Sequence, residues 1–137
     1  MIKKRVLVAE RVRQIRGSFA FIEHRFLRAG FWASLDRHEL LLYLFLVLAS
    51  DRQGITFYGY DKICTLLMLT LEEYIPARDS LIDKDLIAFD GTFFQVLSLP
   101  EIPVKRTRLL TNKDDMAHRD PATVAQIISN SLGGNHD

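Results

Sequence analysis

The stretch HELLLYLFLVLA, residues 38–49, decides how this chain folds. Residues 40–49 are ten consecutive apolar side chains, so a helix built from them has no polar face and must be covered by protein on nearly every side. A bilayer span needs roughly 20 such residues. The run ends at the polar turn 50–54, and we therefore reject a membrane helix. Asp36, followed three residues later by Glu39, has the capping-box form and predicts the start of this central helix.

Composition indicates one globular domain. Of the 137 residues, 48% are hydrophobic and 26% are charged. The single cysteine, Cys64, excludes an internal disulfide framework and suits a reducing compartment. The apolar run after the basic start at 3–5 is too short for a signal peptide, so we expect a cytoplasmic protein.

The net charge of +1 conceals a division along the chain. Residues 1–28 hold eight Lys or Arg against two acidic residues, a local net charge of +6. Residues 29–100 hold five basic against ten acidic residues, a local net charge of −5. A polyanion such as DNA is therefore expected to bind the first segment. The candidate DNA-binding residues are Lys3, Lys4, Arg5, Arg11, Arg13, Arg16, Arg25 and Arg28.

Two features precede the central helix. Residues 1–17 alternate basic and apolar types, which fits either an edge strand or an arm that becomes ordered on contact, and the alternation does not decide between them. Ser18 is a suitable N-cap, and apolar residues then recur at helical spacing. We therefore predict a short amphipathic helix from Phe19 to Ala29.

After the central helix, the pattern predicts a strand followed by two helices. The β-branched and aromatic residues 55–58 are typical of a short strand, and the spacing at 60–67 predicts a helix. Thr70 with Glu73 forms a second capping box, which opens a third helix. Pro76 lies past the first turn of that helix, where it removes one backbone hydrogen bond and is expected to kink the helix.

A hairpin is predicted at residues 86–97, because Asp90-Gly91 between two runs of strand formers is typical of a type I′ turn. A two-residue turn would pair Phe89 with Thr92 and Ile87 with Phe94. The side chains predicted to face the helices are Ile87, Phe89, Phe94 and Val96.

The C-terminal segment divides into a linker and a tail helix. Residues 100–119 are polar, contain prolines and have no periodicity, so we interpret them as a surface linker. Asp120-Pro121 then predicts a helix that extends to Ser131. An isolated helix of this length is marginal, so it must dock on its own domain or on a second copy in a homodimer.

The order helix, strand, helix, tight turn, helix and hairpin resembles that of a winged helix-turn-helix domain. Matching positions run from the second helix into the first wing strand: Ile63, Cys64, Leu67, Leu69, Thr70, Tyr74, Ala77, Leu81, Leu86 and Ile87. The resemblance covers residues 36–99 and implies an α+β, mainly α fold with a winged helix-turn-helix core there. By the patterns described above, a basic arm and helix at 1–35 precede this core, and a linker and tail helix at 100–137 follow it. The resemblance also implies binding to double-stranded DNA, as in small bacterial regulatory or mobile-element proteins.

The chain departs from that family in ways that concern both structure and function. Met68 stands where the family often has Gly, Arg78 where a buried Leu is usual, and Asp85 where Gly commonly takes positive φ. The positions predicted to point outward on the third helix are Leu71, Glu72, Glu73, Ile75, Pro76 and Asp79. None is the Arg, Lys, Asn or Gln that reads bases in the major groove, so this recognition helix is atypically acidic.

Two functional hypotheses follow, and neither is enzymatic, because no nucleophile, phosphate-loop, metal-ligand or cofactor motif is present. The first is a nucleic-acid-binding accessory or regulatory protein whose basic N-terminal segment contacts phosphates. The alternative is a protein–protein interaction module on a winged-helix fold. Its partner-binding residues would be Leu71, Glu72, Ile75 and Pro76.

Overall fold

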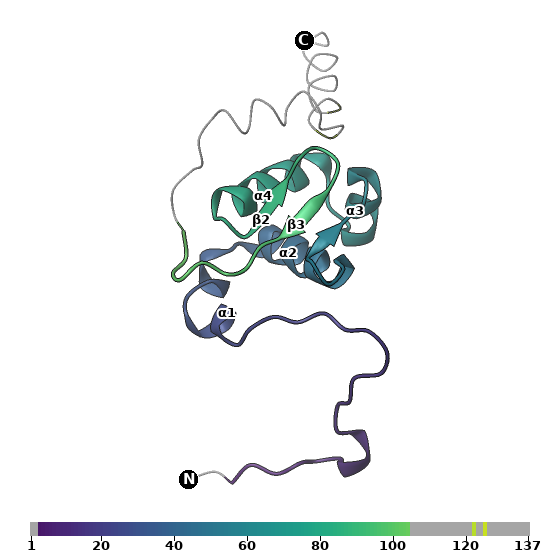
Figure 1. Cartoon of the computed structure of the whole chain (residues 1–137), viewed down its shortest axis with the longest axis vertical. Coiled ribbons are helices and arrows are strands. Elements are labelled where there is room, and N and C mark those ends of the chain that lie inside the picture. Colours follow the sequence, from purple (N-terminus) through teal and green to yellow (C-terminus); the bar gives the residue numbers. More distant parts are fainter. Residues whose placement is uncertain (1–2, 105–121, 123–124, 126–137) are drawn as a thin grey trace.

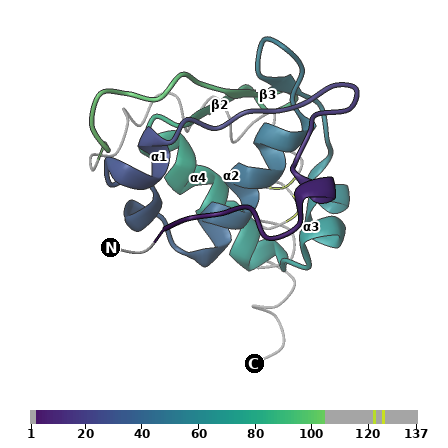
Figure 2. The same ribbon diagram turned by 90° about the horizontal axis from the view of Figure 1, so that it is seen from below.

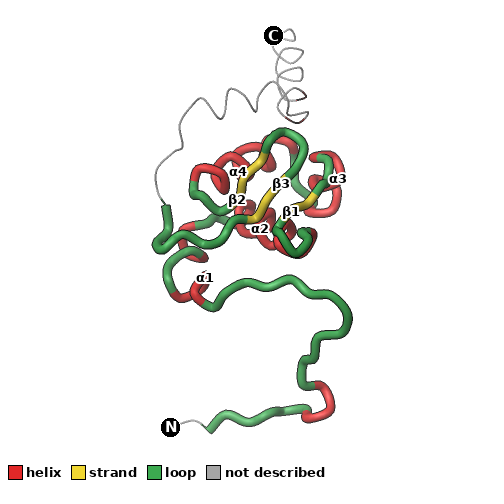
Figure 3. Tube along the Cα trace, in the orientation of Figure 1, coloured by secondary structure: helices red, strands yellow, loops and turns green. Residues whose placement is uncertain are grey.

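The computed structural model describes residues 3–104, Ala122 and Ala125 (Figures 1 and 3). Residues 3–104 form an α+β, mainly helical fold, with four α-helices and a small three-stranded antiparallel sheet in an arrangement compatible with a winged helix. The α-helices and strands are α1 (Arg25–Arg28), α2 (Arg37–Ala49), β1 (Ile55–Thr56), α3 (Tyr60–Leu67), α4 (Leu71–Asp83), β2 (Ile87–Phe89) and β3 (Phe94–Val96). Within the described ranges, no helix is long and apolar enough to span a membrane.

Helix α2 lies at the centre of the domain and packs most extensively against α4 (Figure 1). Leu42 and Leu46 on α2 are completely buried. The expectation that protein covers α2 on nearly every side is wrong, however, because Leu41 is partly exposed and Leu48 is 75% exposed. These two residues are seven positions apart and share a stripe of the helix, and that stripe does not face α4 or the sheet.

The start of α2 is capped as predicted, but only half of the capping box forms. The Asp36 carboxylate accepts a hydrogen bond from the Glu39 backbone N–H at 2.8 Å. The Asp36 backbone N–H does not donate to the Glu39 carboxylate, as a complete box would require. Glu39 pairs with the ammonium group of Lys84, which also donates to the Ser34 carbonyl at 2.7 Å. Glu39 is buried, and a buried carboxylate gains more from a cation than from a second cap.

The segment from α3 to α4 agrees closely with prediction. Helix α3 has the predicted bounds and is capped by Met68, which adopts the left-handed conformation at φ 57°, a conformation that Gly most often takes at the C-terminus of a helix. The Thr70 hydroxyl then accepts from the Glu73 N–H at 3.1 Å, and the Glu73 carboxylate accepts from the Thr70 N–H at 2.9 Å. Asp85, after α4, has φ 62°, again at a position where Gly is common.

The hairpin forms, but its predicted register is wrong. Phe89 pairs with Phe94 and Ile87 with Val96, so the loop between the strands contains four residues instead of two. The Asp90 carboxylate accepts from the backbone N–H groups of Thr92 and Phe93 at 2.8 and 2.7 Å, which stabilises this longer loop. Each partner moved by two positions, which preserves the alternation of faces, so the four predicted side chains still share one face.

The predicted amphipathic helix from Phe19 to Ala29 is mostly absent, because only α1, Arg25–Arg28, is helical. Phe26 is buried and stacks on Tyr43 with ring centroids 4.9 Å apart, whereas Phe19 is 67% exposed. A short helix is marginal in water without tertiary packing, and the segment before α1 has little of it. Of the two alternatives for residues 1–17, the described part is an extended arm with one 3-10 turn at Ala9–Arg11, and it pairs with no strand.

The linker and the tail helix lie mostly outside the described residues. Ala122 and Ala125 are helical, in agreement with the predicted tail helix, and Ala122 is completely buried in the hydrophobic cluster of the domain. The chain therefore contacts its own domain at Ala122. A homodimer formed through the tail stays a prediction.

The orientation of α2 can be tested by shortening one buried and one exposed side chain of the helix. Leu42→Ala should lower the free energy of unfolding by roughly 3 kcal/mol, because it leaves a cavity in the core. Leu48→Ala, on the exposed stripe, should change it by less than about 0.5 kcal/mol. Urea denaturation of both variants measures the difference, and equal effects would contradict the orientation of α2 described above.

Candidate nucleic-acid interface

The N-terminal arm, residues 3–22, runs away from the domain as an extended chain (Figure 1), and in the view from below it passes in front of the domain (Figure 2). Six of the eight predicted DNA-binding residues lie on it, and all six are exposed: Lys3, Lys4, Arg5, Arg11, Arg13 and Arg16. None of these side chains forms a hydrogen bond or ion pair with another residue in the described part of the chain. Their charges face water and are available to a polyanion.

Arg25, by contrast, serves the fold. Its guanidinium donates hydrogen bonds to the carbonyls of Pro100 at 2.6 Å, Leu99 at 3.2 Å and Glu101 at 3.4 Å. It also lies 5.4 Å from the centroid of the Phe31 ring. These contacts tie α1 to the chain that leaves the sheet, 74 to 76 residues later. The remaining candidate, Arg28, is exposed at the end of α1.

Helix α4, the predicted recognition helix, offers little to bases. Glu72 and Pro76 are exposed and Leu71 is half-buried, but Ile75, predicted to point outward, is only 7% exposed. Helix α4 contacts both α2 and β2, so it buries a wide arc that includes Ile75. The predicted apolar contact surface on α4 is therefore smaller than the sequence indicated.

The cations closest to α4 are occupied within the domain. Arg78 is 1% exposed, and its Nε and Nη2 atoms lie 3.1 and 3.0 Å from the Asp79 carboxylate. Its guanidinium also lies 5.7 Å from the ring centroid of Tyr74 and 5.3 Å from that of Phe89. Lys84 is held by Glu39. Both cations therefore already have an acidic partner within the domain.

Both the start of α4 and the loop between β2 and β3 carry carboxylates. Glu73 lies 3.1 Å from His38 Nε2, and the hydrogen bond from the Thr70 N–H is the main cause that holds the pKa of Glu73 below its usual value. Asp90 is exposed at the loop, where it binds backbone N–H groups. An approaching phosphate would meet negative charge at both places.

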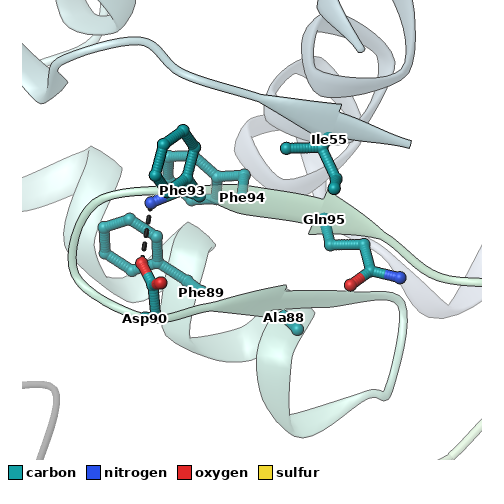
Figure 4. A pocket seen from close by; sticks show the side chains of 7 residues that line it. All are labelled: Ile55, Ala88, Phe89, Asp90, Phe93, Phe94 and Gln95. Carbon is teal, nitrogen blue, oxygen red and sulfur yellow. Dashed lines mark hydrogen bonds between the residues drawn. The ribbon is translucent and has the colours of Figure 1, made fainter. Parts of the chain in front are cut away.

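One surface feature, a groove on the sheet, is absent from the predictions made from sequence. It has a volume of about 450 Å³, and its lining includes outward-facing residues of the sheet together with Phe89 and Phe94 of the core. Ile55, Gln95 and Ala88 form a row across the three strands there (Figure 4). The row depends on β1 pairing with β3, which no local pattern predicts. The sequence did carry one signal for an apolar outer face. Phe57 and Phe93 are each next to an inward-facing strand position, which places both aromatic side chains on the outer face.

No protein-family model, curated protein or solved structure matches this chain, so its function has to be inferred from geometry. Among the residues that the structure describes, no group of three or more His, Cys, Asp or Glu could hold a metal ion. The geometry therefore presents a basic arm joined to a domain whose exposed helix and loop are acidic.

The two arginines of α1 separate a structural role from a binding role. Arg25→Ala should lower the free energy of unfolding by about 2 kcal/mol, because three carbonyl contacts are lost. Arg28→Ala should change it by less than about 0.5 kcal/mol. Urea denaturation measures both, and an Arg25→Ala variant as stable as the parent would remove the structural role.

Glu73 should make stability depend on acid pH. Its pKa is lower in the folded chain than the ordinary value of 4.5, so its ionisation stabilises the fold above that pH, and the contribution is lost as pH falls through the folded pKa. Glu73→Gln keeps an oxygen acceptor but removes the charge. The variant should be less stable than the parent near neutral pH, and the difference in urea midpoint should shrink below about pH 4.5. A difference that is constant across this range would contradict the assignment.

Proposed function

We propose that this protein is a non-enzymatic nucleic-acid-binding accessory or regulatory protein with a winged helix-turn-helix domain. Its basic arm binds backbone phosphates of double-stranded DNA. The observation that carries the proposal is the set of six exposed Lys and Arg side chains on an extended arm with no ionic partner in the described part of the chain. The arm contains a single acidic residue, Glu10, so its net charge is +5.

The dimensions of the arm suit a duplex. The 14 residues from Lys3 to Arg16 span up to about 46 Å when extended. Double-stranded DNA carries one negative charge per roughly 1.7 Å of helix axis, so the arm can meet several phosphates along a groove. Phosphate contacts fix position and orientation but carry no direct sequence information.

The acidic surface of α4 supports a limited role for the domain. Glu72 is exposed, Glu73 is engaged with Thr70 and His38, and Arg78 is buried. Docking of α4 in the major groove would bring carboxylates against phosphates without a base-reading side chain to compensate. In this proposal the domain anchors the arm, and binding has little base specificity.

The protein-interaction alternative receives no support from the surface that suggested it. That surface required Leu71, Ile75 and Pro76 to be exposed together, and Ile75 lies in the core. Any protein interaction has to use a different face.

Salt dependence tests the arm directly. If all six arm cations contact phosphates, the slope of log K against log salt concentration should be about −5 on a duplex. The triple variant Lys3→Ala/Lys4→Ala/Arg5→Ala should weaken binding and make this slope less steep by about 2.7. Fluorescence anisotropy on duplexes of two unrelated sequences measures affinity and slope, and we expect similar values for both sequences.

A matched control removes three exposed cations outside the arm, as Arg37→Ala/Arg52→Ala/Lys62→Ala. This variant loses the same formal charge, so a slope that stays near that of the parent assigns the contacts to the arm. Equal loss in both triple variants would show that net charge alone governs binding. Absence of binding by the parent at low salt would overturn the proposal.

A further inference from the structure

The arm carries apolar side chains as well as cations, and phosphate binding does not use them. Its exposed apolar residues range from 38% to 88% exposure: Val6, Leu7, Val8, Val12, Ile15, Phe19, Phe21 and Ile22. Ala20 is the arm residue that packs against the core cluster. Covering these side chains with another apolar surface would be favourable, because it removes apolar area from water.

The outer face of the sheet is an apolar surface that the described chain leaves uncovered. Phe57 and Phe93, 65% and 49% exposed, form a ridge with ring centroids 5.3 Å apart. Beside the ridge lies the groove of about 450 Å³, lined mainly by apolar residues of β1, β2 and β3 (Figure 4). Since β2 is at the edge of the sheet, an extended segment can pair with it while its side chains enter the groove.

Charge indicates which extended segment fits this surface. Asp90 lines the groove, and residues 29–100 have a net charge of −5. The arm is extended, apolar and carries a net charge of +5. The arm and the domain are therefore opposite in net charge, and the arm and the groove are both largely apolar.

We propose that the arm of one copy docks on the outer sheet face of a second copy, so that two chains exchange arms in a symmetric dimer. In this dimer one part of the arm pairs with the edge of β2, and the rest of the arm crosses the outer sheet face, where its apolar residues cover the groove and the Phe57 and Phe93 ridge. Because each chain supplies one arm and one groove, a two-fold arrangement satisfies both surfaces at once.

The path of the arm favours a second copy over its own domain. Ala20 packs against the core cluster, and from there towards the N-terminus the arm runs away from the domain (Figure 1). No arm residue lines the groove of the same chain. Gly17 has φ 75°, and a Cβ atom added there would have nothing within 4 Å, so it gives the arm a pivot that no contact restricts. The proposal does not depend on DNA binding, since both contact surfaces belong to copies of this chain.

Sedimentation velocity of the full chain without nucleic acid tests the exchange. The parent should sediment as a dimer in the micromolar range. The arm variant Val12→Ser/Ile15→Ser and the ridge variant Phe57→Ser/Phe93→Ser should each weaken the dimer by roughly tenfold or more. All four side chains are exposed and lie outside the core cluster, so unchanged far-UV circular dichroism should show that both variants fold.

Mixing the two variants gives the decisive measurement. A heterodimer keeps one intact contact, the normal arm of the ridge variant in the normal groove of the arm variant. The mixture should therefore associate more tightly than either variant alone. Leu48→Ser, on the exposed stripe of α2, is the control and should leave the dimer unchanged.

Three outcomes overturn the proposal. A monomeric parent throughout the micromolar range excludes arm exchange. A dimer that persists in both the arm and ridge variants uses another surface, and a dimer weakened by Leu48→Ser alone assigns the contact to α2. Because no nucleic acid is present, each result is independent of the DNA-binding test.

Discussion

The packing of α2 against α4 is the contact on which the rest of the structure depends. Leu42 and Leu46 on α2 and Leu81 on α4 are all completely buried, and the sheet and α1 add to the cluster that these residues form. A long apolar helix needs such a partner, because burial of apolar area is the main favourable term in folding. Helix α4 then buries a wide arc, and this burial removes Ile75 and Arg78 from the surface.

Several cations of the domain form contacts within it, and these contacts determine which charges remain on the surface of the chain. Arg25 binds backbone carbonyls, Arg78 lies over two aromatic rings beside Asp79, and Lys84 neutralises the buried Glu39. Buried charges require such partners, since an unpaired one is costly. The domain surface is left with an excess of carboxylates, while the cations of the arm stay solvated. Charge separation in the sequence thereby becomes separation in space between a basic arm and an acidic domain.

Local signals in the sequence predicted the elements that depend on neighbouring residues. Three features were predicted in this way: the bounds of α3, the capping box of Thr70 with Glu73, and the existence of the hairpin. Each depends on residues that lie close to one another in the sequence. The predicted hairpin register was wrong because the Asp90 side chain stabilises a longer loop. The prediction of which side chains face the core was still correct, because the pairing shifted by two residues and side chains alternate with a period of two. The helix predicted from Phe19 failed because the segment before α1 has little tertiary packing, and helical spacing alone does not hold a short helix in water.

The sequence by itself determined the charge division, the central helix and the order of elements, because these follow from composition and short-range periodicity. It also identified the basic residues of the arm as candidates for binding. Only the tertiary structure decided which cations are available, since Arg25 and Arg78 find their partners through contacts that side-chain spacing does not specify. It also decided that β1 joins β3 and creates the outer groove, because pairing between strands far apart in the chain depends on how the helices place them.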